Sequence, residues 1–226
     1  MKKTILIFLL AILQNTYAQK NSGIIVYKVV SLNEINIPKT SNKSKRNKRK
    51  LESFFKKSAA FELVFKGDKS LYKRKIRFDK NGEREKINFY EIFGGGNGVF
   101  YNEKGRVIES VNKYDELFLI KYDSDEWKIS QENKKIGGYL CYKAISKNKK
   151  NTIVWFTPNI PLQFGPKQFK GLPGLILEVQ MGKISIIASE IVFKEVDNIK
   201  QTFKGTVISE SDYKKKIREI AKDFGF

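Results

Sequence analysis

The sequence contains no histidine and a single cysteine, Cys141, among its 226 residues. Without histidine, Ser-His and Cys-His catalysis is excluded, because both mechanisms need an imidazole as the base. Most zinc and copper sites are excluded as well, since one thiol cannot build them. We therefore predict neither a metal nor a cofactor. A lone cysteine forms no internal disulfide, so we expect Cys141 to be a small buried apolar side chain, with a partner disulfide or a reactive thiol as alternatives.

Proline is also scarce, and four of the five prolines lie between Trp155 and Leu177. Proline fixes φ and removes a backbone donor, so this stretch is neither a central strand nor a helix interior. Gly165, Gly171 and Gly174 add positions where φ can be positive. Apolar side chains are interleaved with these residues, namely Phe164, Phe169, Leu172 and Leu175. A loop of this composition is expected to pack against the rest of the protein.

The hexapeptide Gly-Leu-Pro-Gly-Leu-Ile occupies residues 171–176, and Trp-Phe-Thr at 155–157 and Ile-Pro at 160–161 precede it. This arrangement resembles the GLPGLI family of secreted proteins from Bacteroidetes, and the resemblance covers residues 120–195. It implies a secreted, β-rich envelope protein of a family without an established activity. The resemblance supplies no catalytic residues.

Two interpretations of this loop remain open. It is either a rigid, self-packed connection between two core strands, or a rigid docking surface or lid of a ligand pocket. The second interpretation predicts exposed aromatic side chains near Phe164 and Phe169, or an apolar cavity. Its candidate binding residues are Trp155, Phe164, Phe169, Leu172 and Pro173.

The N-terminus has the three parts of a signal peptide. A basic start at residues 1–3 precedes a short apolar run at 4–13 and small residues at 16–18. This pattern predicts a signal peptide over 1–18, cleaved before Gln19. The apolar run is too short for a stable membrane anchor, so we expect no transmembrane span after cleavage. An uncleaved N-terminal anchor is the alternative. The mature chain, 19–226, is then an exported single domain, periplasmic or secreted.

The charge balance is strongly basic, at +20. Only seven of the 44 basic residues are arginines, and they do not cluster, which argues against specific nucleic-acid recognition. A loose affinity for anionic surfaces such as lipid head groups or phosphorylated polysaccharide is expected instead. Residues 38–50 are predicted to be an exposed basic loop. Its cationic side chains for such a surface are Lys43, Lys45, Arg46, Lys48, Arg49 and Lys50.

Short alternating or apolar segments separated by turn residues recur along the chain and predict strands. They lie at 23–32, 60–65, 70–78, 99–101, 106–108, 116–122, 127–131, 138–146, 152–156, 175–181, 184–196 and 204–208. Ser209 to Asp212 supplies a helix start, after which Tyr213, Ile217 and Ile220 recur at helical spacing. We predict a mainly β fold, with an antiparallel, strongly curved sheet or partly open barrel and a C-terminal helix packed on it.

Two further motifs suggest ligand sites, and each has a simpler interpretation. The glycine-rich segment 94–98 lacks the Gly-Lys-Ser/Thr ending of a phosphate loop, so a flexible connector before a hairpin is preferred. The carboxylates at 123–126 could hold calcium, but they lack the glycine and the distal glutamate of a calcium loop. A solvated turn is preferred there.

These observations favour a non-enzymatic binding or accessory protein that docks a partner or a hydrophobic ligand. The expected partner is an envelope protein or lipid. An enzyme is the first alternative, with Glu178 as its best acid–base candidate, because this carboxylate lies in an apolar strand beside the hexapeptide. No second acid is placed to work with it, and the simpler interpretation puts Glu178 on the solvated face of its strand. A purely structural secreted protein is the other alternative.

Overall fold

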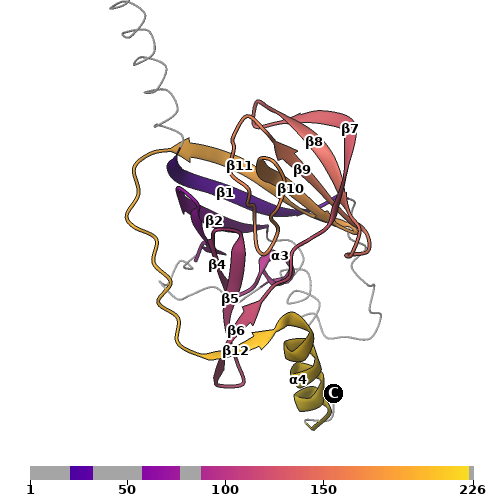
Figure 1. Ribbon diagram of the computed structural model, residues 1–226. Coiled ribbons are helices and arrows are strands. Elements are labelled where there is room, and N and C mark those ends of the chain that lie inside the picture. Colours follow the sequence, from indigo (N-terminus) through magenta and orange to yellow (C-terminus); the bar gives the residue numbers. More distant parts are fainter. Residues whose placement is uncertain (1–20, 33–57, 77–87, 224–226) are drawn as a thin grey trace, which may run out of the picture.

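The structure, a computed structural model, describes residues 21–32, 58–76 and 88–223 (Figure 1). The predicted signal peptide and the basic loop at 38–50 lie outside these residues. The strands are β1 (Ser22–Ser31), β2 (Ala59–Lys66), β3 (Lys69–Arg74), β4 (Val99–Glu103), β5 (Arg106–Lys113), β6 (Glu116–Lys121), β7 (Trp127–Ile136), β8 (Tyr139–Ser146), β9 (Thr152–Thr157), β10 (Leu175–Met181), β11 (Ile184–Phe193) and β12 (Thr206–Ser209). The helices are α3 (Phe89–Gly94) and α4 (Glu210–Asp223).

Within the described residues, the strands form one 12-stranded sheet in the order β12-β6-β5-β4-β3-β2-β1-β11-β10-β9-β8-β7. The sheet is open, since β12 and β7 at its two ends do not pair with each other. It is strongly curved, because β1 and β11 cross the direction of β4, β5 and β6 (Figure 1). The predicted mainly β fold, with a curved open sheet and a C-terminal helix packed on it, is confirmed.

One strand departs from the predicted antiparallel arrangement. β12 runs parallel to β6, pairing Thr206 with Phe118 and Ser209 with Lys121. The chain reaches β12 only after leaving β11 and crossing residues 194–205 to the far edge of the sheet. A connection of this length permits a parallel approach, whereas a short hairpin does not.

Alternation along the strands divides the sheet into two faces. On the inner face, side chains of β1 to β4 are almost entirely buried and aromatic rings dominate, including Phe61 stacked on Tyr72 with ring centroids 5.2 Å apart. The members of this core include Ile25, Tyr27, Leu63, Phe65 and Phe100. Cys141 is fully buried, as predicted, and burial raises the pKa of its thiol to about 11.

Helix α3 was not predicted, because six residues are too few to show a helical period. A capping box starts it, since the Asn88 side chain accepts from the Glu91 backbone N–H and the Glu91 carboxylate accepts from the Asn88 N–H, both at 3.0 Å. Glu91 also pairs with Arg74 at 2.9 Å, and both side chains are buried. This ion pair joins α3 to β3, and the glycine-rich segment at 94–98 then leads into the β4–β5 hairpin.

Helix α4 begins and packs as the sequence predicts. The Ser209 hydroxyl accepts from the Asp212 backbone N–H at 3.1 Å and caps the helix. The Tyr213 ring meets Phe118 of β6 edge to face, with centroids 5.2 Å apart. No helix among the described residues is long and apolar enough to cross a membrane.

Residues 158–174, here called the motif loop, join β9 to β10 and pack against the inner face of the sheet. Backbone bonds tie the loop to the start of β10, from the Leu175 N–H to the Ile160 carbonyl at 2.9 Å and from the Ile176 N–H to the Phe164 carbonyl at 3.1 Å. Its buried hydrophobic side chains are Ile160, Leu162, Phe164, Phe169 and Leu172. The loop is therefore the rigid, self-packed connection between two core strands that one of the two interpretations predicted.

The three glycines of the motif loop serve different purposes. Gly171 has φ +83°, and an added Cβ there would have no atom closer than 4.0 Å. At Gly174 an added Cβ would lie 2.1 Å from the Thr157 carbonyl oxygen, which is backbone and cannot move aside cheaply. Gly165 does not have a positive φ, contrary to expectation. It is needed for space, since a Cβ there would lie 2.6 Å from the Cβ of Ile176.

These contacts predict unequal costs for two alanine substitutions in the hexapeptide. Gly171→Ala should lower the free energy of unfolding by about 1–2 kcal/mol, the cost of a left-handed backbone in a residue with a Cβ. Gly174→Ala should cost about 3 kcal/mol or more, because the β9–β10 backbones must separate. Urea unfolding of both variants measures the difference, and equal costs would contradict the close packing at Gly174.

Candidate functional site

The structure does not bring the five predicted binding residues together on one surface. Phe164, Phe169 and Leu172 are 4%, 1% and 1% exposed and belong to the core, whereas Pro173 is exposed. Alternation along β9 places Trp155 on the face opposite to its neighbours Val154 and Phe156. The expectation of exposed aromatic side chains near Phe164 and Phe169 is wrong, because these rings fill the inside of the curved sheet.

On the outer face, Trp155 lies in a polar cluster around Glu178. Glu178 is only 2% exposed, so its predicted place on a solvated face is wrong. Its carboxylate pairs with Lys134 and accepts from Gln180 at 2.8 Å and from Ser185 at 2.7 Å. The Lys134 ammonium also lies 4.3 Å from the centroid of the Trp155 ring. None of these hydrogen-bonding partners is a second carboxylate.

A second group of polar contacts holds the motif loop from the side of β7. The Trp127 indole N–H donates to the Lys170 carbonyl at 2.8 Å. Asp125 is buried and pairs with Lys149, whose ammonium lies 5.6 Å from the Phe169 ring centroid. Burial raises the pKa of the Asp125 carboxyl, and the Lys149 bond offsets only part of that effect. The predicted solvated turn at 123–126 is thus partly buried at Asp125.

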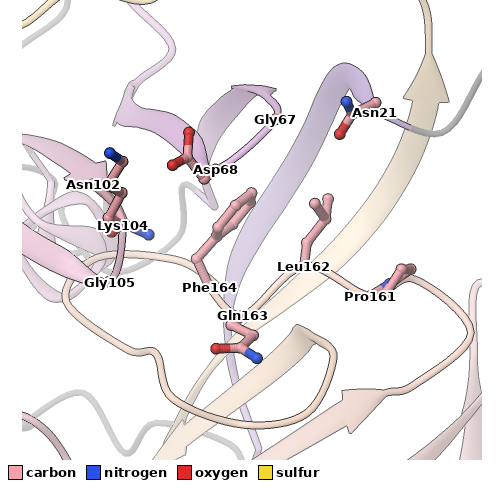
Figure 2. Close-up of a pocket in the computed structure, with 10 residues that line it drawn as sticks. All are labelled: Asn21, Gly67, Asp68, Asn102, Lys104, Gly105, Pro161, Leu162, Gln163 and Phe164. Carbon is pink, nitrogen blue, oxygen red and sulfur yellow. The ribbon is translucent and has the colours of Figure 1, made fainter. Parts of the chain in front are cut away.

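The motif loop also forms one wall of a pocket at the rim of the sheet, with a volume of about 390 Å³. Figure 2 shows that side chains from three other places meet the loop there: the start of β1, the β2–β3 turn and the β4–β5 hairpin. The polar side chains that line this rim pocket are Asn21, Asp68, Asn102, Lys104 and Gln163 (Figure 2). Leu162 and Phe164 add an apolar wall. Its size is within the usual range for small-ligand sites.

Asn102 is the unusual member of the rim pocket. It is 5% exposed, and its Oδ1 atom has no hydrogen-bond partner in the described structure. Leaving a buried acceptor unpaired costs about 1–3 kcal/mol, so such groups call for an explanation. A ligand that offers a donor would remove this cost.

Sequence reasoning missed Asn102 and Asp68. Asn102 is two residues from Phe100, and alternation therefore turns both toward the inner face of β4. The signal available in the sequence was a polar residue at an inward-facing position of a strand. Asp68 gave none, because a carboxylate in a tight turn is ordinary. Phe164 is the residue that belongs both to the predicted set and to this pocket.

The fold and the pocket together define a class of protein: an open, curved β-sheet protein with a self-packed loop and a polar rim pocket. Comparison with known families gives a match in one segment: a family described as "Protein of unknown function (Porph_ging)" matches residues 146–178. That segment includes β9, the motif loop and the start of β10. No curated protein matches the chain.

Among solved structures, that of PNGF-II resembles the chain with a TM-score of 0.54 and 19% sequence identity. The similarity covers 87% of this chain but only 33% of the PNGF-II chain. This chain therefore corresponds to about one third of that protein. At this identity the resemblance concerns the fold alone.

The unpaired acceptor leads to a prediction for Asn102→Leu. Leucine has a similar volume and no polar atom, so the ligand-free protein should gain about 1 kcal/mol in free energy of unfolding. Urea unfolding of the purified protein measures this change. A loss of stability would mean that Asn102 is already satisfied within the fold. Asn112→Leu, an exposed position on β5, serves as the control and should change stability little.

Asp125 predicts a pH dependence. Its pKa is higher in the folded protein than its ordinary value of 3.8, so the folded state holds the proton more tightly. This carboxyl therefore makes stability fall as pH rises from about 4 through the raised pKa. In the Asp125→Asn variant, the part of the pH dependence of stability that this carboxyl causes should disappear. Thermal unfolding at several pH values, compared with wild type, measures it, and identical slopes would rule the shift out.

Proposed function

We propose that the chain is an exported, non-enzymatic docking protein of the cell envelope that receives a polar segment of a partner protein in the rim pocket. The observation that carries this proposal is the buried, unpaired Oδ1 of Asn102, a residue that lines a cavity of about 390 Å³. A backbone N–H, a side-chain amide or an ammonium group of the partner would pair with that atom. The motif loop is held by backbone bonds and core packing, so the pocket loses little entropy on binding.

Export is part of the proposal and rests on the signal-peptide pattern at 1–18 and on the resemblance to secreted proteins. The finer assignment, to the GLPGLI family, rests on the hexapeptide at 171–176. This hexapeptide lies inside the segment, 146–178, that matches a family of unknown function. A periplasmic or secreted location follows from the same proposal.

The alternative ligands have less support. A lipid in the concave sheet would compete with the motif-loop side chains that occupy the inner face. Binding of an anionic surface by the basic residues between Lys43 and Lys50 remains a proposal, because these residues lie outside the described part of the chain. An enzyme based on Glu178 is not favoured, because Lys134, Gln180 and Ser185 already bond its carboxylate.

Site-directed photo-crosslinking tests the docking proposal. The single native cysteine is buried, so a Gln163→Cys variant of the mature chain can be labelled selectively with a thiol-reactive benzophenone. Gln163 is exposed and lines the rim pocket. After irradiation in an envelope extract from the native cells, we expect an adduct larger by the mass of one protein.

The matched control is Lys128→Cys, which places the same label on the exposed edge strand β7. The protein adduct should be absent from this control and lost when Asn102→Leu is added to the Gln163→Cys variant. A lipid-sized adduct would favour the hydrophobic-ligand alternative. Equal labelling from both positions, or none, would refute docking at the rim pocket.

A further inference from the structure

A second pocket lies elsewhere on the inner face, where the glycine-rich turn after α3 meets the motif loop and the start of α4. Its volume is about 450 Å³. This inner pocket shares no lining residue with the rim pocket. It contains residues that none of the sequence interpretations singled out, chiefly Glu109, Lys167 and Gln168.

Glu109 projects from β5 into the inner pocket. One carboxylate oxygen accepts a hydrogen bond from the Tyr122 hydroxyl. A Cβ on Gly98 would lie 2.3 Å from the other oxygen, so the carboxylate occupies the space that this glycine leaves open. Among the described residues, Glu109 forms no ion pair, although the protein carries a net charge of +20. Burial raises the pKa of its carboxyl, and the hydrogen bond from Tyr122 and the positive charge of Lys167 offset only part of that effect.

The motif loop supplies two more groups to this pocket. Gln168 is 9% exposed, and its Oε1 atom is buried without a hydrogen-bond partner in the described structure. Lys167 has φ +56°, a left-handed conformation that is strained for a residue with a side chain. Its ammonium donates to the Phe93 carbonyl at 3.2 Å and is not within ion-pair distance of Glu109. Burial lowers the pKa of Lys167, and the residue as a whole is half-buried.

The pocket lining combines oxygen acceptors with two lysines, Lys113 and Lys167. Glu109 offers a carboxylate oxygen and Gln168 an amide oxygen. Lys167 is held by a backbone carbonyl, and the Lys113 ammonium lies 5.0 Å from the ring centroid of Tyr114, which is not part of the lining. Glu210 adds a second carboxylate, which Lys214 pairs at 2.6 Å. Three aromatic rings line the same space, those of Phe100, Tyr122 and Tyr213. Carboxylate and amide oxygens combined with aromatic faces are the chemistry that recognises an organic cation.

We propose that the inner pocket binds a small primary amine in its ammonium form. The ammonium donates to the Glu109 carboxylate and to the Gln168 amide oxygen, and its carbon chain lies against the aromatic rings. The ligand supplies the ion-pair partner that Glu109 lacks within the described residues, and the donor that the Gln168 amide oxygen lacks there. This site is independent of partner docking at the rim pocket.

The test uses three probes of equal chain length: n-butylammonium, 1-butanol and butyrate. Each is titrated into the mature protein, and amide chemical shifts of Gly95, Gly96 and Gln168 are followed by NMR. We expect saturable shifts with n-butylammonium and none with the other two at the same concentration. Equal shifts with 1-butanol would show a merely apolar cavity, and tighter binding of butyrate would reverse the proposed charge. Either result overturns the proposal, as does the absence of saturable shifts.

Three variants distinguish ligand binding at this site from a purely structural role of its residues. Glu109→Gln keeps an acceptor for Tyr122 but removes the charge, so the dissociation constant of n-butylammonium should rise about tenfold or more. Lys167→Met removes a nearby like charge and should tighten binding, whereas a weakened affinity contradicts an ammonium ligand. Gln163→Ala, in the same loop but in the rim pocket, should leave binding unchanged.

Gln168→Leu provides the second route if Glu109→Gln does not fold. It removes the unpaired amide oxygen from the loop and should also weaken n-butylammonium binding. An unchanged dissociation constant in a folded Gln168→Leu protein would count against the proposed contact. Crosslinking from Gln163→Cys should be unaffected by either variant, so failure here and failure of partner docking give different results.

Discussion

Five apolar side chains of the motif loop occupy the space inside the curved sheet, and the remaining features depend on this packing. Full burial of such side chains stabilises the fold by about 1.5–3 kcal/mol each. Together they are comparable with the whole net stability of a domain. The loop turns back onto the inner face because Gly174 lets its backbone approach Thr157 closely. Without that approach, neither pocket would have its loop wall.

The same packing explains why the loop side chains that line the pockets lie beside the hexapeptide rather than in it. Leu172 and Phe169 stabilise the loop, and Pro173 restricts its backbone, so these side chains are not free to bind a ligand. The polar loop residues Gln163, Lys167 and Gln168 face the two pockets instead. The rim pocket adds Asn102 of β4 to these loop residues, and the inner pocket adds Glu109 of β5. The loop therefore forms a wall of both pockets.

Buried charges elsewhere in the sheet are matched closely. Arg74 pairs with Glu91, and Glu178 has three partners. Glu109 differs, because it is half-buried and lacks an ion-pair partner in the described part of the chain. Removing a charge from water is costly unless it is paired, so a fold keeps such a group at a cost to stability. The carboxylate of the inner pocket therefore differs from those of the ion pairs that stabilise the sheet, because it has no described cationic partner.

Strand positions, the packed loop and the C-terminal helix could be predicted from the sequence, because period-two alternation, proline spacing and the Ser209 cap are local signals. Helix α3 and the parallel direction of β12 could not be predicted. The first is too short for a period, and the second depends on where residues 194–205 carry the chain. The burial of Glu178, the unpaired Oδ1 of Asn102 and the lack of a described ion pair at Glu109 were decided by the tertiary structure alone, because the environment of a polar side chain is set by strands distant in sequence.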